Sequence, residues 1–170
     1  SRHEEAFKNI LQCFSDAGYD VFFKLMNAND YNTPQDRLRV IIIGFRKDLG
    51  IQFEFPQPID HKPTLKDAIW DLKDSATPAK ALNHSHCSQL PFPNHEFMIG
   101  GFSPMFMTRN RVRSWDQPSF TIQASGRHAP LHPSAPTMEK TGKDQFVFKP
   151  GCEDQYRRLS VRECARIQTF

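Results

Sequence analysis

The 170-residue sequence lacks any long apolar run, and this absence narrows the classes of protein to which it can belong. A membrane-spanning helix needs about 18 consecutive apolar residues, and no stretch approaches that length. The first residues also lack the basic start and apolar middle of a signal peptide. We therefore expect a cytoplasmic protein with no membrane partner.

Cysteine is scarce and irregularly spaced, with no Cys-x-x-Cys pair, so neither a disulfide framework nor a zinc knuckle is indicated. One short stretch does gather metal-binding residue types. Its spacing fits no standard zinc pattern, and we predict no metal site there, although a metal-stabilised nucleic-acid adaptor stays open as an alternative. The four cysteines are Cys13, Cys87, Cys152 and Cys164, and the stretch comprises His84, His86, Cys87 and His95.

Acidic residues are nearly missing between residues 97 and 138, where Asp116 is the only one. The same window holds Arg109, Arg111, Arg113 and Arg127 and no lysine, which gives a net charge of +3 from 4 minus 1. The whole chain has the same net charge, 22 minus 19, so its entire positive excess lies in this window. Arginine without lysine favours planar, bidentate recognition over loose electrostatic attraction.

The N-terminal third predicts part of a layered α/β domain. Phe7, Ile10, Leu11 and Phe14 recur at helical spacing, which predicts a helix over about the first 17 residues that ends near Gly18. Residues 20–27 alternate in part, and the apolar, β-branched run at 38–45 is typical of a buried central strand. One helix and two strands cannot cover both faces of such a sheet, so we expect the domain to be incomplete over residues 1–55.

After residue 55 prolines become frequent and apolar runs become short. Prolines mark a linker with a short helix at 56–77, which Thr64 can cap, and an irregular module of small strands and long loops at 78–153. Ser160 to Glu163 form a capping-box pattern that opens a helix within 154–170. Methionines and phenylalanines between 97 and 107 are expected to form the small core of the irregular module.

Two stretches resemble motifs of the cytosine-5 DNA methyltransferases. Residues 34–40, Pro-Gln-Asp-Arg-Leu-Arg-Val, resemble the family's Gln-x-Arg-x-Arg motif, and residues 158–170 resemble its Arg-Glu-x-Ala-Arg-hydrophobic-Gln motif. The stretch between them, 107–127, stands where the family keeps its target-recognition region, and it resembles the HaeIII-type subgroup that modifies the inner cytosine of GGCC. The resemblance spans essentially the whole chain.

The resemblance implies a fold and a partner. The fold is a partial Rossmann-like, S-adenosylmethionine-dependent methyltransferase sheet with a small irregular target-recognition domain, and the partner is double-stranded DNA. The complete protein would be a monomer in the bacterial cytoplasm, in a restriction-modification system. The Phe-x-Gly-x-Gly loop, the Pro-Cys nucleophile, the Glu-Asn-Val acid and the Gly-Asn-Ala-Val-Pro segment of the family are missing here. We therefore expect a fragment that is inactive alone; a non-catalytic DNA-binding module is the alternative.

The first motif implies supporting roles in catalysis. By resemblance, Arg39 would donate to the exocyclic oxygen of a flipped cytosine and pair with the missing acid. Gln35 and Arg37 would brace the site and the nearby main chain. Their alternate spacing puts the three side chains on one side of an extended segment. Without the resemblance, solvated arginines at a strand edge would be the simpler interpretation.

The arginines of the recognition region predict base contacts. A guanine presents O6 and N7 in the major groove, which the arginine fork matches. On an extended segment Arg109, Arg111 and Arg113 would share one face, and Arg127 follows a glycine that permits a tight turn. We predict base contacts for Arg109, Arg111 and Arg127, phosphate binding or ring packing for Arg113, and contact with a base face for Met105. Contacts to phosphates alone are the open alternative.

The second motif predicts a structural hinge. By resemblance, Arg162, Glu163 and Arg166 would form buried or half-buried ion pairs between the two lobes of the enzyme. An exposed helix with charges at its N-terminus would carry the same capping box, and the sequence does not separate the two interpretations.

Overall fold

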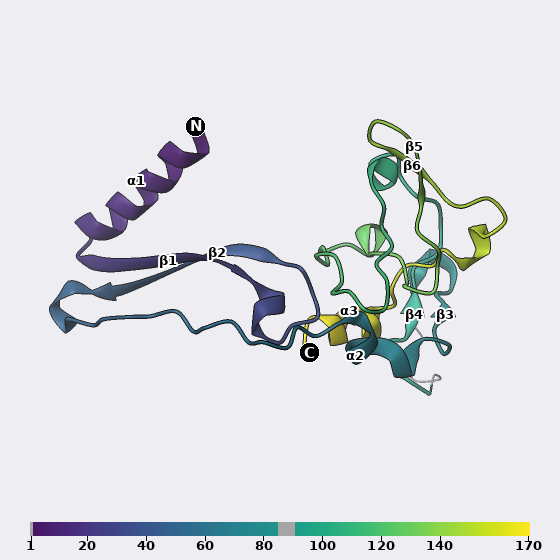
Figure 1. Ribbon diagram of the computed structural model, residues 1–170, viewed down its shortest axis with the longest axis horizontal. Helices are drawn as coiled ribbons and strands as arrows, with labels where there is room; N and C mark the ends of the chain where they lie inside the picture. The colour runs from purple at the N-terminus through teal and green to yellow at the C-terminus, as the bar shows by residue number, and fades with distance from the viewer. Residues whose placement is uncertain (1, 85–90) are drawn as a thin grey trace. The chain divides into compact units, whose positions relative to one another are not determined.

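The N-terminal residues form a helix and two strands, as their apolar spacing predicts, and the two strands pair in antiparallel orientation. In the computed structural model, which describes residues 2–84 and 91–170, α1 spans Arg2–Asp16, β1 spans Tyr19–Asn27 and β2 spans Leu38–Arg46 (Figure 1). Gly18, between α1 and β1, has a φ of 87°, which favours glycine. The helix therefore ends where the sequence predicts.

Aromatic contacts hold α1 and the strand pair together. On one face of β1, the ring of Phe23 meets that of Phe7 from α1 edge-on, with centroids 5.0 Å apart. On the other face, the rings of Phe22, Phe45 and Phe53 form a cluster with centroid distances of 5.7–6.2 Å. Successive side chains of a strand point to opposite faces, so both faces of the pair carry apolar groups.

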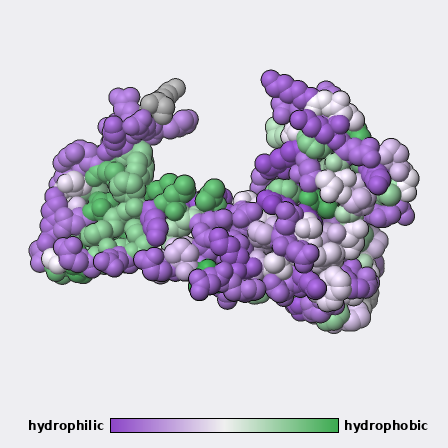
Figure 2. Space-filling model, viewed as in Figure 1, coloured by the Kyte–Doolittle hydropathy of each residue, from purple (hydrophilic) through white to green (hydrophobic). Residues whose placement is uncertain are grey.

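The expectation that residues 38–45 form a buried central strand is wrong for the described chain. β2 pairs with β1 alone among residues 2–84 and 91–170, in a register that sets Tyr19 opposite Arg46 and Asn27 opposite Leu38. A strand that is apolar on both faces is buried only when other residues pack on both faces. Among the described residues, few pack on β2, and most of its side chains are exposed. Figure 2 shows hydrophobic side chains gathered over this part of the chain; the exposed ones include Ile10, Phe14, Phe23, Leu25, Leu38, Val40 and Ile41.

The chain divides into two compact units. Unit 1 comprises Ser1–Asn27 and Leu38–Pro58, and unit 2 comprises Ala28–Arg37 and Ile59–Phe170. The first motif is thus divided, with residues 34–37 in unit 2 and residues 38–40 in unit 1. The predicted linker, recognition module and hinge helix lie almost entirely in unit 2 as well.

Unit 2 is built of short helices and strands. Its two α-helices begin at the predicted capping residues, Thr64 and Ser160, and each has a complete capping box. The helices are α2 (Leu65–Ile69) and α3 (Val161–Ile167), and the strands are β3 (Thr77–Pro78), β4 (Glu96–Phe97), β5 (Glu139–Gly142) and β6 (Gln145–Val147).

Two apolar clusters form the core of unit 2. The first lies between α2 and α3, where Ile69, Leu72 and Ile167 are fully buried. The second lies under the recognition segment; it contains Phe106, Leu131 and Met138 and is flanked by Phe102 and Met107. These phenylalanines and Met107 confirm the predicted core, whereas Met105 is 72% exposed and takes no part in it.

A Rossmann-like sheet is not evident among residues 2–84 and 91–170. The described strands form three separate two-stranded sheets, of which only β3 and β4 run parallel. A parallel doubly wound sheet needs long crossover connections, usually helical. Within the same residues, no helix is long and apolar enough to cross a membrane.

Candidate functional site

Gln35 anchors the first motif to unit 2. The main chain of residues 34–36 runs beside Ser119, with the Asp36 N–H 2.8 Å from the Ser119 carbonyl oxygen and the Ser119 N–H 2.9 Å from that of Pro34. Gln35 is buried, and its Oε1 accepts the N–H of Ile122 at 3.2 Å. The side chain thus holds main chain within the recognition region, residues 107–127.

Charged residues near Gln35 make further contacts between the first motif and the recognition region. Arg113 donates to the Asp36 carboxylate at 3.1 Å and lies over the Phe120 ring, 4.3 Å from its centroid. Arg37 is half-buried, with one Nη 3.5 Å from the carbonyl oxygen of Ile122. Arg39 belongs to unit 1, is exposed, and donates to the carbonyl oxygen of Leu38 at 2.6 Å.

Arg111 lies inside unit 2, which differs from the expected shared exposed face. Its Nε donates to the carbonyl oxygen of Phe106 at 2.7 Å and one Nη to that of Met105 at 3.1 Å. The guanidinium also lies 4.7 Å from the centroid of the Phe106 ring, and its burial, followed by the charge of Arg109, lowers its pKa. In this conformation Arg111 holds the turn at 105–106 rather than presenting its fork outward.

Arg109 and Arg127 are the exposed arginines of the recognition region. Arg127 lies in the short 3-10 helix Gly126–His128, whose first turn is capped by the Ser125 hydroxyl, 3.3 Å from the Arg127 N–H. A Cβ at Gly126 would lie 3.2 Å from the sulfur of Met98, so Met98 packs closely against this glycine. Arg127 also lines an open pocket of about 550 Å³ next to residues 98–103.

Arg158 is a buried cation that sequence reasoning did not single out. Its residue is 3% exposed, and its guanidinium lies 3.9 Å from the centroid of the Phe102 ring. It donates to the carbonyl oxygens of Gly101 at 2.8 Å, Gly100 at 3.1 Å and Arg127 at 3.4 Å. Burial, followed by the charge of Arg127, lowers its pKa.

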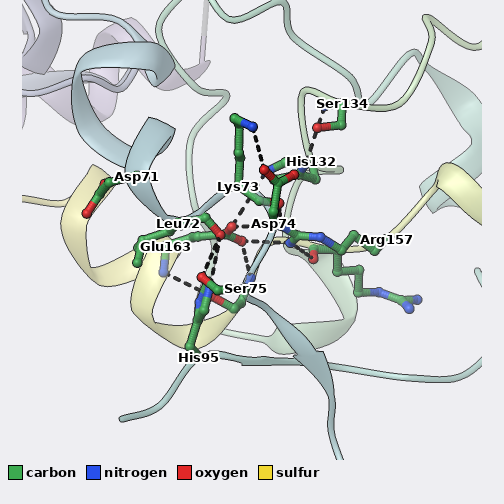
Figure 3. Close-up of polar contacts among 12 residues, drawn as sticks. Asp71, Leu72, Lys73, Asp74, Ser75, His95, His132, Ser134, Arg157 and Glu163 are labelled. Atoms are coloured by element: carbon green, nitrogen blue, oxygen red, sulfur yellow. Dashed lines mark hydrogen bonds and ion pairs between the residues drawn. The ribbon is translucent and has the colours of Figure 1, made fainter. Parts of the chain in front are cut away.

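The hinge motif centres on Glu163, which is fully buried (Figure 3). Arg157 binds both carboxylate oxygens at 2.8 Å, and the N–H of Ser160 donates to Oε2 at 2.8 Å. Burial acts to raise the pKa of Glu163, but the hydrogen bonds and charge of Arg157 outweigh it, so the pKa lies below its ordinary value. Arg157 was likewise not singled out from the sequence.

The other predicted hinge residues have different partners. Arg166 forms an ion pair with Asp71 at 2.6 Å, near the surface, and this pair links α3 to the residues that follow α2. Arg162 donates through Nε to the carbonyl oxygen of Pro93. The partners of Arg162 and Arg166 are distant in sequence, so the sequence alone does not reveal them. For Arg157 and Arg158, the one available signal was the arginine pair itself, which stands just before Leu159 and the capping box.

His95 is a core histidine with both ring nitrogens engaged. Its Nε2 lies 3.0 Å from the carbonyl oxygen of Leu72, which can only accept, so the proton is on Nε2. Nδ1 then accepts from the Ser160 hydroxyl at 2.8 Å, and that oxygen accepts the Glu163 N–H at 3.1 Å. Of the stretch considered for metal binding, His86 and Cys87 lie outside the described residues. No cluster of metal-binding side chains occurs within the described part of the chain.

Comparison with known proteins identifies the family. The full chain, residues 1–170, matches the sequence pattern of the C-5 cytosine-specific DNA methylases. It is 56% identical over 168 residues to the type II methyltransferase M.MthTI of Methanothermobacter thermautotrophicus, covering 99% of this chain and 51% of that protein. M.FnuDI of Fusobacterium nucleatum is 56% identical over 172 residues, with 99% and 50% covered. The chain belongs to the C-5 cytosine-specific DNA methylase family.

The chain spans about half the length of these curated relatives. A crystal structure described as a DNA modification methyltransferase encoded within an E. coli prophage matches 98% of this chain and 55% of its own, with a TM-score of 0.58 and 14% identity. At that identity the likeness concerns the fold alone, a mixed α/β arrangement.

Proposed function

We propose that the protein containing this chain transfers a methyl group from S-adenosylmethionine to C5 of a flipped cytosine in double-stranded DNA, within GGCC, in a restriction-modification system. Family membership supports the reaction class. The observation that carries the proposed readout is the exposure of Arg109 and Arg127 on unit 2, in a window with a net charge of +3. In this proposal, unit 2 reads the sequence.

Arginine forks suit the guanines of the proposed target. Each guanine offers O6 and N7 in the major groove, and one bidentate pair discriminates by about 1 to 3 kcal/mol. Arg109 and Arg127 can present their forks directly. Arg111 can do so only after exchanging the carbonyls of Met105 and Phe106 for base acceptors. Met105, whose side chain is largely exposed and whose carbonyl oxygen accepts from Arg111, is proposed to contact a base face.

The first motif is proposed to support the reacting base. Arg39 would donate to the exocyclic oxygen of the flipped cytosine, which must leave the stack before its ring can be reached. Gln35 accepts the N–H of Ile122 and Arg37 donates to its carbonyl oxygen, so their part is to brace the main chain. The hinge residues Glu163, Arg162 and Arg166 fix α3 against the rest of unit 2.

The described residues do not make up a site for the methyl donor. Gly100 and Gly101 are the only adjacent glycines, and a glycine pair could have formed such a cradle. Their carbonyl oxygens accept from the buried guanidinium of Arg158, so this glycine pair is already engaged within unit 2. The glycine pair therefore does not form a cradle for S-adenosylmethionine.

Binding of the full-length protein to short duplexes tests the readout. One duplex carries GGCC, and others have one guanine permuted at a time; each is titrated over a range of salt. Arg109→Ala and Arg127→Ala should each lower discrimination by about 5- to 150-fold at one base-pair position. Arg46→Ala, which removes an exposed charge from unit 1, is the matched control and should leave discrimination unchanged.

Two outcomes would contradict the proposal. Equal binding to all duplexes by the wild-type protein, falling steeply with salt, would mean that the arginines hold only the DNA backbone. Discrimination that survives both substitutions would place the readout elsewhere in the protein.

A further inference from the structure

The main chain of Arg127 is held at both of its polar groups. Its N–H donates to the Ser125 hydroxyl at 3.3 Å, and its carbonyl oxygen accepts from Nε of Arg158 at 3.4 Å. Met98 packs against Gly126, the residue before it. The exposed guanidinium of Arg127 is therefore presented from a fixed turn.

Arg158 joins this turn to a second loop. Its two Nη atoms donate to the carbonyl oxygens of Gly100 and Gly101, while Phe102 stacks on the guanidinium plane. A planar fork with five N–H donors can serve carbonyls on both loops at once, and a lysine ammonium cannot reproduce this geometry. Loss of the fork would free the Arg127 carbonyl and the loop of residues 98–101 together.

The main chain of Arg158 is itself part of the core. Residue 158 pairs with Leu131 in an antiparallel bridge, and the Leu159 N–H donates to the Pro130 carbonyl oxygen at 2.9 Å. Two residues later α3 begins. Arg158 is thus fixed in the core through its main chain, and its guanidinium links the core to the turn that carries Arg127.

We propose that Arg158 is a positioning residue that sets the sequence specificity of Arg127, an inference that rests on the proposed function. A recognition side chain on a fixed main chain loses less conformational entropy on binding, so its discrimination between bases is preserved. Arg158 is buried and does not itself contact DNA. Its removal relaxes the choice of base at one position only, the position that Arg127 reads.

Arg158→Lys in the full-length protein tests this inference on the singly permuted duplexes. The variant keeps the positive charge, so the dependence of binding on salt should not change. Discrimination should fall about 3- to 10-fold at the position that Arg127→Ala relaxes, and at no other. Leu159→Ala, which opens a cavity at the neighbouring buried residue, is the control for lost stability and should leave discrimination at every position intact.

Double variants separate positioning from a merely structural role. Arg158→Lys with Arg127→Ala should lose no more discrimination than Arg127→Ala alone, whereas Arg158→Lys with Arg109→Ala should multiply the two losses. Should Arg158→Lys fail to fold, Ser125→Ala removes the other anchor of the same turn and should relax the same position.

Multiplicative losses with Arg127→Ala, or relaxation at all positions alike, would overturn the inference. Failure of the proposed function looks different, because the wild-type protein itself would then show no preference for GGCC. A wild-type preference combined with multiplicative losses rejects the role of Arg158 alone.

Discussion

At the scale of single residues, the buried charges around α3 determine how the protein responds to acid. The imidazole of His132 is buried, and its Nδ1 accepts the Ser134 N–H at 3.3 Å, so the proton is on Nε2. Nε2 lies 3.5 Å from the Glu163 carboxylate, whose two oxygens are already bound by Arg157 (Figure 3). Burial, followed by the charge of Arg157, lowers the pKa of His132 to about 4.

His132 is therefore predicted to make the free energy of unfolding depend on pH. A histidine in the unfolded chain has a pKa near 6.5. Between pH 6.5 and about 4, His132 is therefore protonated in the unfolded chain and neutral in the folded protein. Stability from this residue is complete above pH 6.5 and is lost as the pH falls toward 4, by at most ~3 kcal/mol. Glu163, with its pKa below the ordinary value of 4.5, begins to lose its contribution only as the pH falls through about 4.5, at the acidic end of that window.

Urea unfolding of wild-type protein and of His132→Gln at pH 7 and pH 4.5 measures this dependence. The wild-type protein should lose more free energy of unfolding between the two pH values than the variant, because glutamine at position 132 does not titrate. His61→Gln, at an exposed position, should behave as the wild type does. An identical pH dependence in His132→Gln and wild type would rule out this role of His132.

Local sequence could not separate the arginines of the recognition region from one another. Arg109, Arg111 and Arg113 share a residue type and a regular spacing, yet one is exposed, one binds main-chain carbonyls and one pairs with Asp36, 77 residues away. Their positions depend on the Phe106 ring and on a distant carboxylate. The spacing predicted a shared face correctly only for an ideal strand, and residues 109–113 do not form one.

At the scale of elements, two capping boxes of the same type differ in their surroundings. Thr64 caps α2 near the surface, whereas Ser160 caps α3 in the core and also donates to His95. Loss of an N-cap costs about 1 kcal/mol, and a buried acceptor left without its donor adds about 1 to 3 kcal/mol. The two helices therefore depend on their caps to different degrees.

Thr64→Ala should lower the free energy of unfolding by about 1 kcal/mol and Ser160→Ala by about 2 to 3 kcal/mol. Chemical denaturation at pH 7 measures both. Combining Ser160→Ala with His95→Phe, which removes the stranded acceptor, should cost less than the sum of the single changes. Equal losses for the two cap variants would show that His95 gains nothing from Ser160.

Elements whose signals are local were the most predictable. The helix at 2–16, the strand pair and both capping boxes follow from spacing and from Gly18, Thr64 and Ser160. The surroundings of β2 could not be predicted in this way. Its apolar run indicates that both faces are suited to burial, but it does not indicate which residues pack on them. The two-residue strands β3 and β4 carry too little pattern to be predicted at all.

At the scale of the whole molecule, the chain combines a hairpin unit with exposed apolar side chains and an irregular unit with its own two cores. It matches the family over its full length while spanning about half of the relatives. The motifs of residues 34–40 and 158–170 were sufficient to indicate this family from the sequence. The proposed GGCC target comes from the resemblance of residues 107–127 to one subgroup of the family.

Bisulfite sequencing of DNA treated with the full-length protein and S-adenosylmethionine tests the proposed reaction and its target together. We predict 5-methylcytosine at the inner cytosine of GGCC, relaxed to related sites by Arg127→Ala, and no methylation by the 170-residue chain alone. Absence of 5-methylcytosine with the full-length protein, or methyl transfer by the isolated chain, would contradict this prediction.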